Sequence, residues 1–491
     1  MKYKAAGAVA CAVMLLISAM NLPALLGDDT GRYHQHLKAE EKAPCSHNSD
    51  VFCTHLPLLS INTGGKEIPG KAVQEGHKTV GYTTAEDGSD RIQAQIDVFD
   101  SDTSNNHPTD TPTITSEMTI HVRGNSSRTF DKLGYRINLL DKNGENNPQP
   151  LLGMDAHHEW ALHGPFLDKT LMRNYMWYNI GGEIMGYAPN VRFCELIING
   201  NYMGVYVLTE IITAGKEGSR LNVTIDAKDN TFTGYVLQLD RLDGEEYNHL
   251  KSFTTYTIRT KNKLEIVYPG RSNMTEELYE GIKQDFSAFE KTLYSYDYDN
   301  EKYGYEDMID VDSFVDYFLI NEFTCNYDAG WLSTYIYKDI DGKFRMCLWD
   351  FNSACDNYQQ AYMPENHFEM QLDLWFYMLF KDEHFTDRCV ERYRELRKTY
   401  LNDEYLYSYI DGVAAYLGDA IQRNYEKWGY SFAEEYDLLK PTERNPRNYE
   451  QSLAAMKKFI AVRGAWMDEN IETLKQYSAG SKVKKFNENA N

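Results

Sequence analysis

The sequence has no excess of positive charge. It contains 50 Lys and Arg against 73 Asp and Glu, which gives a formal net charge of −23 over 491 residues. Phosphate backbones are bound by basic surfaces, so this balance argues against nucleic acid as a partner. A polyanionic ligand would need a metal ion or a local group of Lys and Arg side chains to overcome the field of the whole chain.

Close cysteine pairs and internal repeats are also missing. None of the eight cysteines stands in the C-x-x-C spacing of a zinc site, and no repeated segment indicates a solenoid. The apolar fraction of 42% and the charged fraction of 25% are ordinary for a globular protein. A chain of this length can bury a large core, and a two-lobed body with small additions fits it.

A long uncharged run stands at the N-terminus, from Ala5 to Gly27, between Lys4 and Asp28. This is the layout of a secretory signal or of an N-terminal anchor. As a helix the run would span about 34 Å, which is enough for a bilayer, and no clean A-x-A cleavage site is present. We therefore expect residues 1–28 to be a signal peptide or a membrane anchor, and the rest to be extracytoplasmic, either secreted or held at the cell surface.

Composition divides the remaining chain into three parts. Residues 29–115 are interpreted as a stalk and a small β-rich N-terminal region, which ends after a polar, proline-containing loop at 101–112. Residues 116–440 form the main domain, where strands precede helices, and 441–491 form a C-terminal helix with a polar tail. We expect an α+β fold with a helical C-terminal part.

A polar loop between two predicted strands is the first candidate site. Apolar residues alternate with polar ones over 118–122 and again over 135–139, so the loop joins two half-buried strands. Glycine lets backbone N–H groups approach an anion, serine hydroxyls add donors, and a lysine supplies a charge suited to phosphate. The loop is therefore a candidate nucleotide site, and the alternative is a polar hairpin turn with surface cations. The candidate residues are Arg123, Asn125, Ser126, Ser127 and Lys132.

Two acidic loops form the second candidate site. A predicted helix around 314–320 runs into Asp328, and a hairpin with an Asp341-Gly342 turn then returns the chain to Asp350. This order of helix, acidic loop, hairpin and acidic loop brings two carboxylates to one phosphate in the catalytic half of kinases. We expect Asp350 to hold Mg²⁺ and Asp328 to orient or deprotonate an attacking hydroxyl. Alternatively, each aspartate is an ordinary turn residue.

Further motifs follow one another between Ile92 and Lys440. They include Arg123-Gly124-Asn125-Ser126-Ser127-Arg128, Glu159-Trp160-Ala161-Leu162, Leu167-Asp168-Lys169, Met172-Arg173-Asn174, Asn199-Gly200, Gly204-Val205-Tyr206 and Trp349-Asp350-Phe351. In these motifs and in their order the chain resembles the CotH (spore coat protein H) kinases, an atypical branch of the protein-kinase-like superfamily. Several ordered motifs over some 300 residues are more specific than any single one.

The resemblance implies a two-lobed kinase-like fold and an atypical protein serine/threonine kinase that depends on ATP and on Mg²⁺ or Mn²⁺. Lys132 would contact the nucleotide phosphates, Asp328 would be the catalytic aspartate, and Asp350 would be the metal ligand. Similar proteins phosphorylate serine on spore-coat proteins, and others are cell-surface proteins. The implied partner is therefore a protein substrate with a Ser or Thr acceptor.

Some kinase features have no clear counterpart. Asn326-Tyr327-Asp328 stands in place of His-Arg-Asp, and no asparagine lies five residues after Asp328 to serve as a second metal ligand. Asn352 replaces the glycine of Asp-Phe-Gly, and asparagine is among the few residues that tolerate left-handed backbone geometry. The conventional constellation is therefore present only in part.

The partner of Lys132 is open between Glu183 and Glu210. We favour Glu210, because it follows a strand that can enter the floor of the cleft, and Gln238 is placed to face the adenine. A different class of function also stays open, because ATP is scarce outside cells. The same scaffold would then be a non-catalytic surface protein that binds cell-wall glycans or partner proteins.

Overall fold

The computed structural model describes residues 32–38, 42, 51–76, 78–215, 220–225, 232–241, 249–250, 263–359 and 366–478. The chain divides into Met1–His34 and the compact body Gln35–Asn491, which contains all the helices and strands described. The expected signal or anchor at 1–28 lies outside the described residues. In the part that is described, no helix combines the length and the apolar character needed to cross a membrane.

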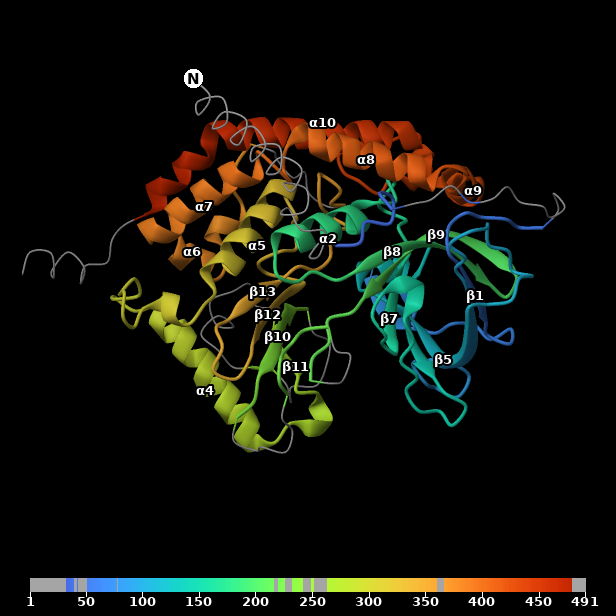
Figure 1. The fold of residues 1–491 in the computed structure, drawn as a ribbon, viewed down its shortest axis with the longest axis horizontal. Helices are drawn as coiled ribbons and strands as arrows, with labels where there is room; N and C mark the ends of the chain where they lie inside the picture. The colour runs from blue at the N-terminus through green and yellow to red at the C-terminus, as the bar shows by residue number, and fades with distance from the viewer. Residues whose placement is uncertain are drawn as a thin grey trace, which may run out of the picture. The chain divides into compact units, whose positions relative to one another are not determined.

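Seven strands close into a barrel in the order β1-β4-β5-β6-β7-β9-β8 (Figure 1). They are β1 (Leu58–Asn62), β4 (Ile92–Phe99), β5 (Ile114–Arg123), β6 (Gly134–Leu140), β7 (Glu159–His163), β8 (Val191–Ile198) and β9 (Asn201–Glu210). Neighbours are antiparallel except β1 and β8. The alternation predicted on both sides of the polar loop is confirmed, because Met118 lies opposite Leu139 and Ile120 opposite Ile137, all buried in the barrel core.

β1 and β4 are strands of this same barrel, although the sequence analysis assigned them to a separate region at 29–115. β1 is hydrogen-bonded to β4 on one side and to β8 on the other, so the barrel closes through it. The loop at 101–112 is therefore the connection between two neighbouring strands rather than a domain boundary. A separate two-stranded ribbon, β2 (Ala72–Glu75) and β3 (Lys78–Tyr82), stands between β1 and β4 in the chain.

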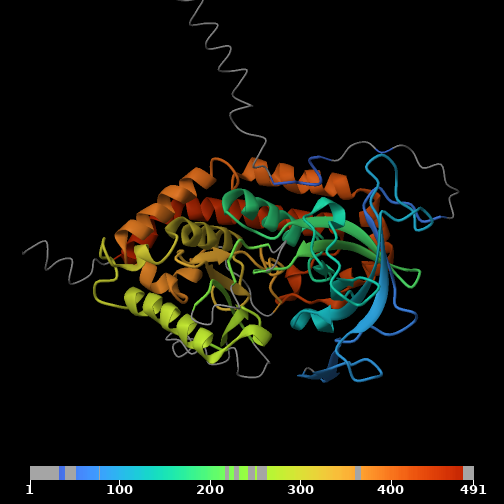
Figure 2. The same cartoon turned by 60° about the horizontal axis from the view of Figure 1, so that its bottom comes forward.

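A four-stranded sheet with the order β11-β10-β12-β13 follows the barrel. Its strands are β10 (Tyr235–Asp240), β11 (Lys263–Tyr268), β12 (Thr334–Lys338) and β13 (Arg345–Cys347). One face packs Leu237 and Ile336 into the main core with α4 (Glu276–Leu293) and α5 (Val311–Thr324), which lie against the sheet in both views (Figures 1 and 2). Because side chains alternate along a strand, the other face carries Gln238, Asp240 and Tyr335.

The described residues contain eight helices, which together with the sheets confirm a mixed α+β fold. Besides α4 and α5 these are α2 (Arg173–Ile184), α6 (Phe376–Leu379), α7 (Glu383–Leu396), α8 (Asp403–Leu417), α9 (Asp419–Trp428) and α10 (Tyr449–Asn470). α2 contacts β8, and α9 contacts β9, so helices from distant parts of the chain cover the barrel on that side (Figure 1).

A buried ion pair ties α10 to the end of α5. Arg463 on α10 donates to the carboxylate of Glu322 on α5 at 2.7 Å and to the Glu322 carbonyl at 2.9 Å. The same carboxylate accepts the backbone N–H groups of Glu369 and Met370, at 3.0 and 2.9 Å. α5 is therefore fixed at the point where the chain leaves it for the first acidic loop.

Candidate functional site

The two acidic loops meet, as the sequence predicted. α5 ends at Thr324, and Cys325 turns the chain out of the helix with a φ of +44°. β12 and β13 then form an antiparallel hairpin that brings the chain back to Asp350. The Asn326 side chain joins the loops, because its Nδ2 donates to the Asp350 carbonyl at 3.0 Å. The carboxylates of Asp328 and Asp350 therefore share one location.

α2 holds Asp350 in a defined conformation. The residue has a φ of +53°, and its backbone N–H donates to the Tyr178 hydroxyl at 2.9 Å. The next N–H, that of Phe351, donates to Asn174 Oδ1 at 2.8 Å, while the buried Phe351 ring packs against Trp177 and Tyr178. The aromatic core thus fixes the loop backbone, and the Asp350 side chain stays half-buried at its edge.

Three carboxylates crowd this location. Burial, the Asp350 charge and Asp240 raise the pKa of Asp328 to about 7, against an opposing effect of Arg241. Burial also raises the pKa values of Asp350 and Asp240. Asp328 Oδ1 and Asn326 Oδ1 are both buried without a hydrogen-bond partner in the described part of the chain. The centre is therefore acidic, self-repelling and incompletely hydrogen-bonded.

Arg123, at the end of β5, is the cation that acts on Asp350, whereas Arg241 acts on Asp328 and Asp240. Arg123 lowers the pKa of Asp350, and its guanidinium lies 5.6 Å from the centroid of the Trp349 ring, within range of a cation–π contact. Across the residues that the structure describes, the guanidinium of Arg123 has neither a hydrogen bond nor an ion pair. A half-buried guanidinium without a polar partner can bind an anion in two-pronged geometry.

Lys132 does not lie where the sequence analysis expected it. Its side chain is 1% exposed, and Nζ donates to the Val205 carbonyl and to Asn424 Oδ1, both at 2.7 Å. Burial holds its pKa well below the ordinary value for lysine. Its polar contacts among the described residues belong to β9 and α9, so Lys132 connects these two elements and is not presented to a phosphate.

Glu210 does not pair with Lys132 either. One oxygen of its buried carboxylate lies 3.3 Å from Arg220 Nη1, and the other accepts the backbone N–H of Asn190 at 2.9 Å. The other candidate, Glu183, interacts with the Tyr400 hydroxyl. The strand before Glu210 was predicted correctly, but it carries the carboxylate to a different arginine.

The polar loop after Arg123 folds back on itself. Ser126–Thr129 form a short 3₁₀ turn, and Arg128 Nε donates to the Gly124 carbonyl at 2.6 Å. Gly124 has a φ of +107°, and a Cβ there would lie 2.0 Å from Ser127 Oγ, so only glycine fits. Asn125 and Ser126 are exposed and Ser127 is half-buried, which leaves their side chains accessible beside Arg123.

Gln238 belongs to the acidic side of the site. Its Nε2 donates to Asp240 Oδ2 at 3.0 Å, and its neighbour across the sheet is Tyr335. The pKa of Tyr335 is raised by burial and by Asp240, while Arg123 opposes this, so the face of the four-stranded sheet looks toward the end of β5. Gln238 thus orients a carboxylate of the centre.

No role was predicted from the sequence for the groups that hold the loops. Asn326, Asn174 and Tyr178 supply the amide and hydroxyl contacts described above. A signal for Asn326 was present, because it is the second residue after the helix and directly precedes the dipeptide that ends in Asp328. No such signal exists for Asn174 and Tyr178, which act from a helix more than 170 residues earlier in the chain.

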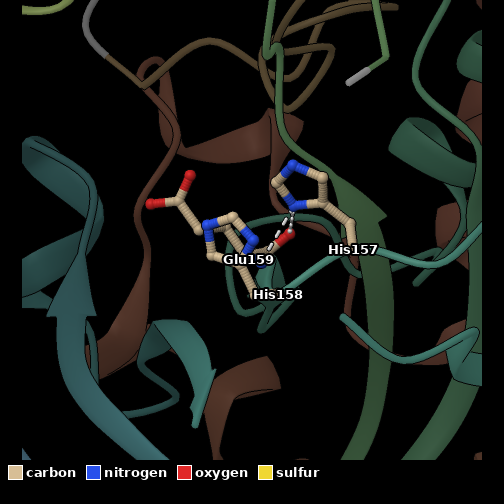
Figure 3. A group of neighbouring side chains, drawn as sticks. All are labelled: His157, His158 and Glu159. Atoms are coloured by element: carbon tan, nitrogen blue, oxygen red, sulfur yellow. Dashed lines mark hydrogen bonds between the residues drawn. The ribbon is translucent and has the colours of Figure 1, made fainter. Parts of the chain in front are cut away.

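A separate group of possible metal ligands, His157, His158 and Glu159, lies at the start of β7 (Figure 3). His157 Nδ1 accepts the backbone N–H of Glu159 at 2.9 Å, and the two imidazole rings stack with centroids 4.5 Å apart. The Glu159 carboxylate binds Arg136 Nη2 at 2.9 Å. Parallel rings direct their nitrogen lone pairs side by side rather than to one point, and an arginine already neutralises the carboxylate. Contacts within the protein thus account for the Glu159 carboxylate and for His157 Nδ1, whereas His157 Nε2 is buried without a hydrogen-bond partner in the described residues.

Comparison with known proteins gives two findings. The CotH kinase protein family matches residues 120–467, which is more than half of the chain. The inner spore coat protein H of Bacillus subtilis (strain 168) is 22% identical over 246 residues, covering 48% of this chain and 59% of that protein. The chain thus spans about three fifths of the length of this relative. The motifs quoted from the sequence and the family match agree, and the chain belongs to the CotH kinase protein family.

Proposed function

We propose that this protein is an atypical protein kinase that transfers the γ-phosphoryl group of ATP to a Ser or Thr hydroxyl of another protein. The observation that carries the proposal is the meeting of Asp328, Asp350 and Arg123 at one place, where the Arg123 guanidinium has no polar partner among the described residues. Phosphoryl transfer requires a positioned carboxylate, a metal-binding carboxylate and a cation near the phosphates. In this proposal the barrel and the helical part are the two lobes of a kinase-like fold, with the site at their junction.

The residues at the centre fit a divalent cation. They offer carboxylate and carboxamide oxygens, the ligands that Mg²⁺ and Mn²⁺ prefer. Asp350 would hold the ion, and the oxygens of Asp328 and Asn326 that lack a partner among the described residues are further donors. A bound divalent ion would neutralise charge on the phosphate oxygens and relieve the repulsion among the carboxylates.

Each protein group has a defined part in the proposed reaction. Asp328, whose pKa is near 7, is poised to accept the proton of the attacking hydroxyl at neutral pH. Arg123 binds phosphoryl oxygens, and the loop of Asn125, Ser126 and Ser127 next to it supplies further donors. Tyr178 and Asn326 hold the backbone of the Asp350 loop, so that the carboxylate needs little reorganisation.

The proposed site of action is outside the cytoplasm, at a coat or surface. The relative in Bacillus subtilis is named as an inner spore coat protein. The uncharged segment from Ala5 to Gly27 supports the same location, as a signal peptide or as the protein's one contact with a membrane. The acceptor would then be a coat or surface protein with accessible Ser or Thr residues.

Two measurements test this proposal on the chain from residue 29 onward, without the uncharged segment. In a thermal shift assay, ATP with Mn²⁺ should raise the melting temperature of the wild type and not that of Asp350→Ala, because only a ligand that binds the folded state stabilises it. In a transfer assay with γ-³²P-labelled ATP, the wild type should label itself or a Ser-containing acceptor, and Asp328→Asn should not.

The outcomes separate the proposal from its alternative. If neither stabilisation nor labelling occurs, the protein is a non-catalytic surface protein, and glycans or partner proteins become the ligands to test. If labelling persists undiminished in Asp328→Asn, the assignment of the proton acceptor is refuted.

A further inference from the structure

Three residues form a row across adjacent strands beside the acidic centre. Arg123 on β5 lies opposite Gly134 on β6. Tyr135 lies opposite Leu162, so the next position places His163 on β7 opposite Gly134. Opposed residues of antiparallel strands point to the same side of the sheet. Because Tyr135 and Leu162 belong to the barrel core, Arg123, Gly134 and His163 point out of the barrel.

Gly134 leaves the middle of the row without a side chain. A Cβ at this position would lie 3.2 Å from the Leu162 carbonyl oxygen and 3.9 Å from Arg123 Cγ. It would therefore take up space directly beside the stem of the arginine. Gly134 is itself buried, and because it is glycine, no side chain stands between Arg123 and His163 in this row.

His163, at the other end of the row, carries a polar ring. The residue is half-buried, and among the described residues its imidazole has no hydrogen bond or ion pair. The charged groups that face it are Arg123, Lys132 and Asp168. Burial and the charge of Arg123 lower its pKa to about 3, so the ring is neutral at physiological pH and carries one N–H donor.

We propose that His163 is a second donor to the anion that Arg123 binds, so that Arg123, Gly134 and His163 form a subsite for a phosphoryl group of the nucleotide. The arginine supplies the charge and the imidazole supplies a donor without adding like charge beside it. This inference rests on the proposed nucleotide-dependent function. It adds a ligand-binding residue from a third strand of the barrel.

The test uses calorimetric titration of ADP, pyrophosphate and adenosine in the presence of Mn²⁺. For His163→Ala, the Kd of ADP and of pyrophosphate should rise about tenfold, as expected for the loss of a hydrogen bond to a charged group. The Kd of adenosine should not change. For His163→Gln, whose amide N–H can replace the ring donor, the rise should be no more than about threefold.

Two further variants separate the subsite from general damage to the barrel. His121→Ala is the matched control, because His121 lies on the same outward face of β5, two residues before Arg123 and opposite Arg136. It should leave the affinities for all three ligands unchanged. Gly134→Ala keeps both donors but fills the space between them, and it should weaken pyrophosphate binding. Thermal unfolding without ligand establishes that each variant is folded.

The results distinguish this inference from the proposed function. If the wild type binds ADP and pyrophosphate and His163→Ala binds them equally well, the role of His163 is overturned while the nucleotide site stands. If the wild type binds neither ligand, both proposals are overturned. A loss of adenosine binding equal to that of ADP would place His163 at the nucleoside instead and contradict the phosphoryl subsite.

Discussion

The carboxylates of Glu322 and Asp328, at the same end of α5, have opposite surroundings. Glu322 has both oxygens occupied, by Arg463 and by the backbone N–H groups of the 369–370 segment. Asp328, six residues later, has a buried oxygen without a partner in the described chain and shares its surroundings with Asp350. This fold can thus provide a buried carboxylate with an ion pair and with hydrogen bonds to both oxygens. Within the described ranges, the carboxylate of Asp328 lacks such partners, and a bound ligand would supply them.

The two cations that flank the polar loop show the same contrast. Lys132 is fully buried and bonded to Val205 and Asn424, whereas Arg123 is half-buried without a polar partner among the described residues. Lysine and arginine therefore have different tasks here: the first joins α9 to the barrel, and the second faces the acidic centre. Because the Lys132 side chain is buried and its ammonium group is hydrogen-bonded, we interpret Lys132 as a structural residue.

Breaking the ion pair between Arg463 and Glu322 should have the largest effect on stability. Arg463→Met leaves the Glu322 carboxylate buried and uncompensated, so the free energy of unfolding should fall by about 3–5 kcal/mol in urea titrations. Lys457→Met is the control on the same helix, because Lys457 pairs with Asp411, whose side chain is 64% exposed, and it should change stability by less than about 1 kcal/mol. Equal effects for the two variants would contradict the comparison.

Replacing the two loop cations should separate stability from binding. Lys132→Met removes the donor to Asn424 and Val205 and should lower the free energy of unfolding by about 1–3 kcal/mol, with the Kd for Mn²⁺–ATP unchanged. Arg123→Met should change stability by less than about 0.5 kcal/mol and raise that Kd at least about tenfold. Urea unfolding and calorimetry measure the two quantities. If the two variants exchange these effects, Lys132 is the phosphate ligand after all.

The acidic centre should make the metal-free protein less stable as the pH rises. The pKa of Asp328 is about 7 in the folded state and near its ordinary value of about 3.9 when unfolded, so the folded state binds the proton more tightly. This contribution to stability is present below about pH 4 and is lost as the pH rises toward 7. Asp328→Asn should remove that part of the slope. Melting temperatures from pH 4.5 to 7.5 with EDTA would show it, and identical slopes for both proteins would exclude it.

Local patterns in the sequence were sufficient to predict the strands around the polar loop and the return of the chain to Asp350. Period-2 alternation fixed the β5–β6 pairing, and the Asp341-Gly342 turn set the length of the β12–β13 hairpin, so both acidic loops had to come together. These features depend on neighbours that are close in the chain.

Contacts between distant segments could not be predicted in the same way. Lys132 meets Asn424, which is 292 residues away, and nothing near Lys132 in the sequence indicates a buried partner. The closure of the barrel depends on β1 pairing with β8 across more than 130 residues, so β1 and β4 looked like a separate region. Glu210 was predicted to lie at a strand end, but its partner Arg220 follows that strand in a loop without periodicity.

Binding of Mn²⁺ in the presence of ATP shows whether Asp350 holds the metal ion of the nucleotide. Electron paramagnetic resonance measures the free ion, and its signal should fall when wild-type protein is added to Mn²⁺–ATP and recover when Asp350→Ala is used instead. We expect this difference because Asp350 is the carboxylate proposed to hold the ion beside Asp328 and Arg123. Equal loss of the free signal with both proteins would contradict it.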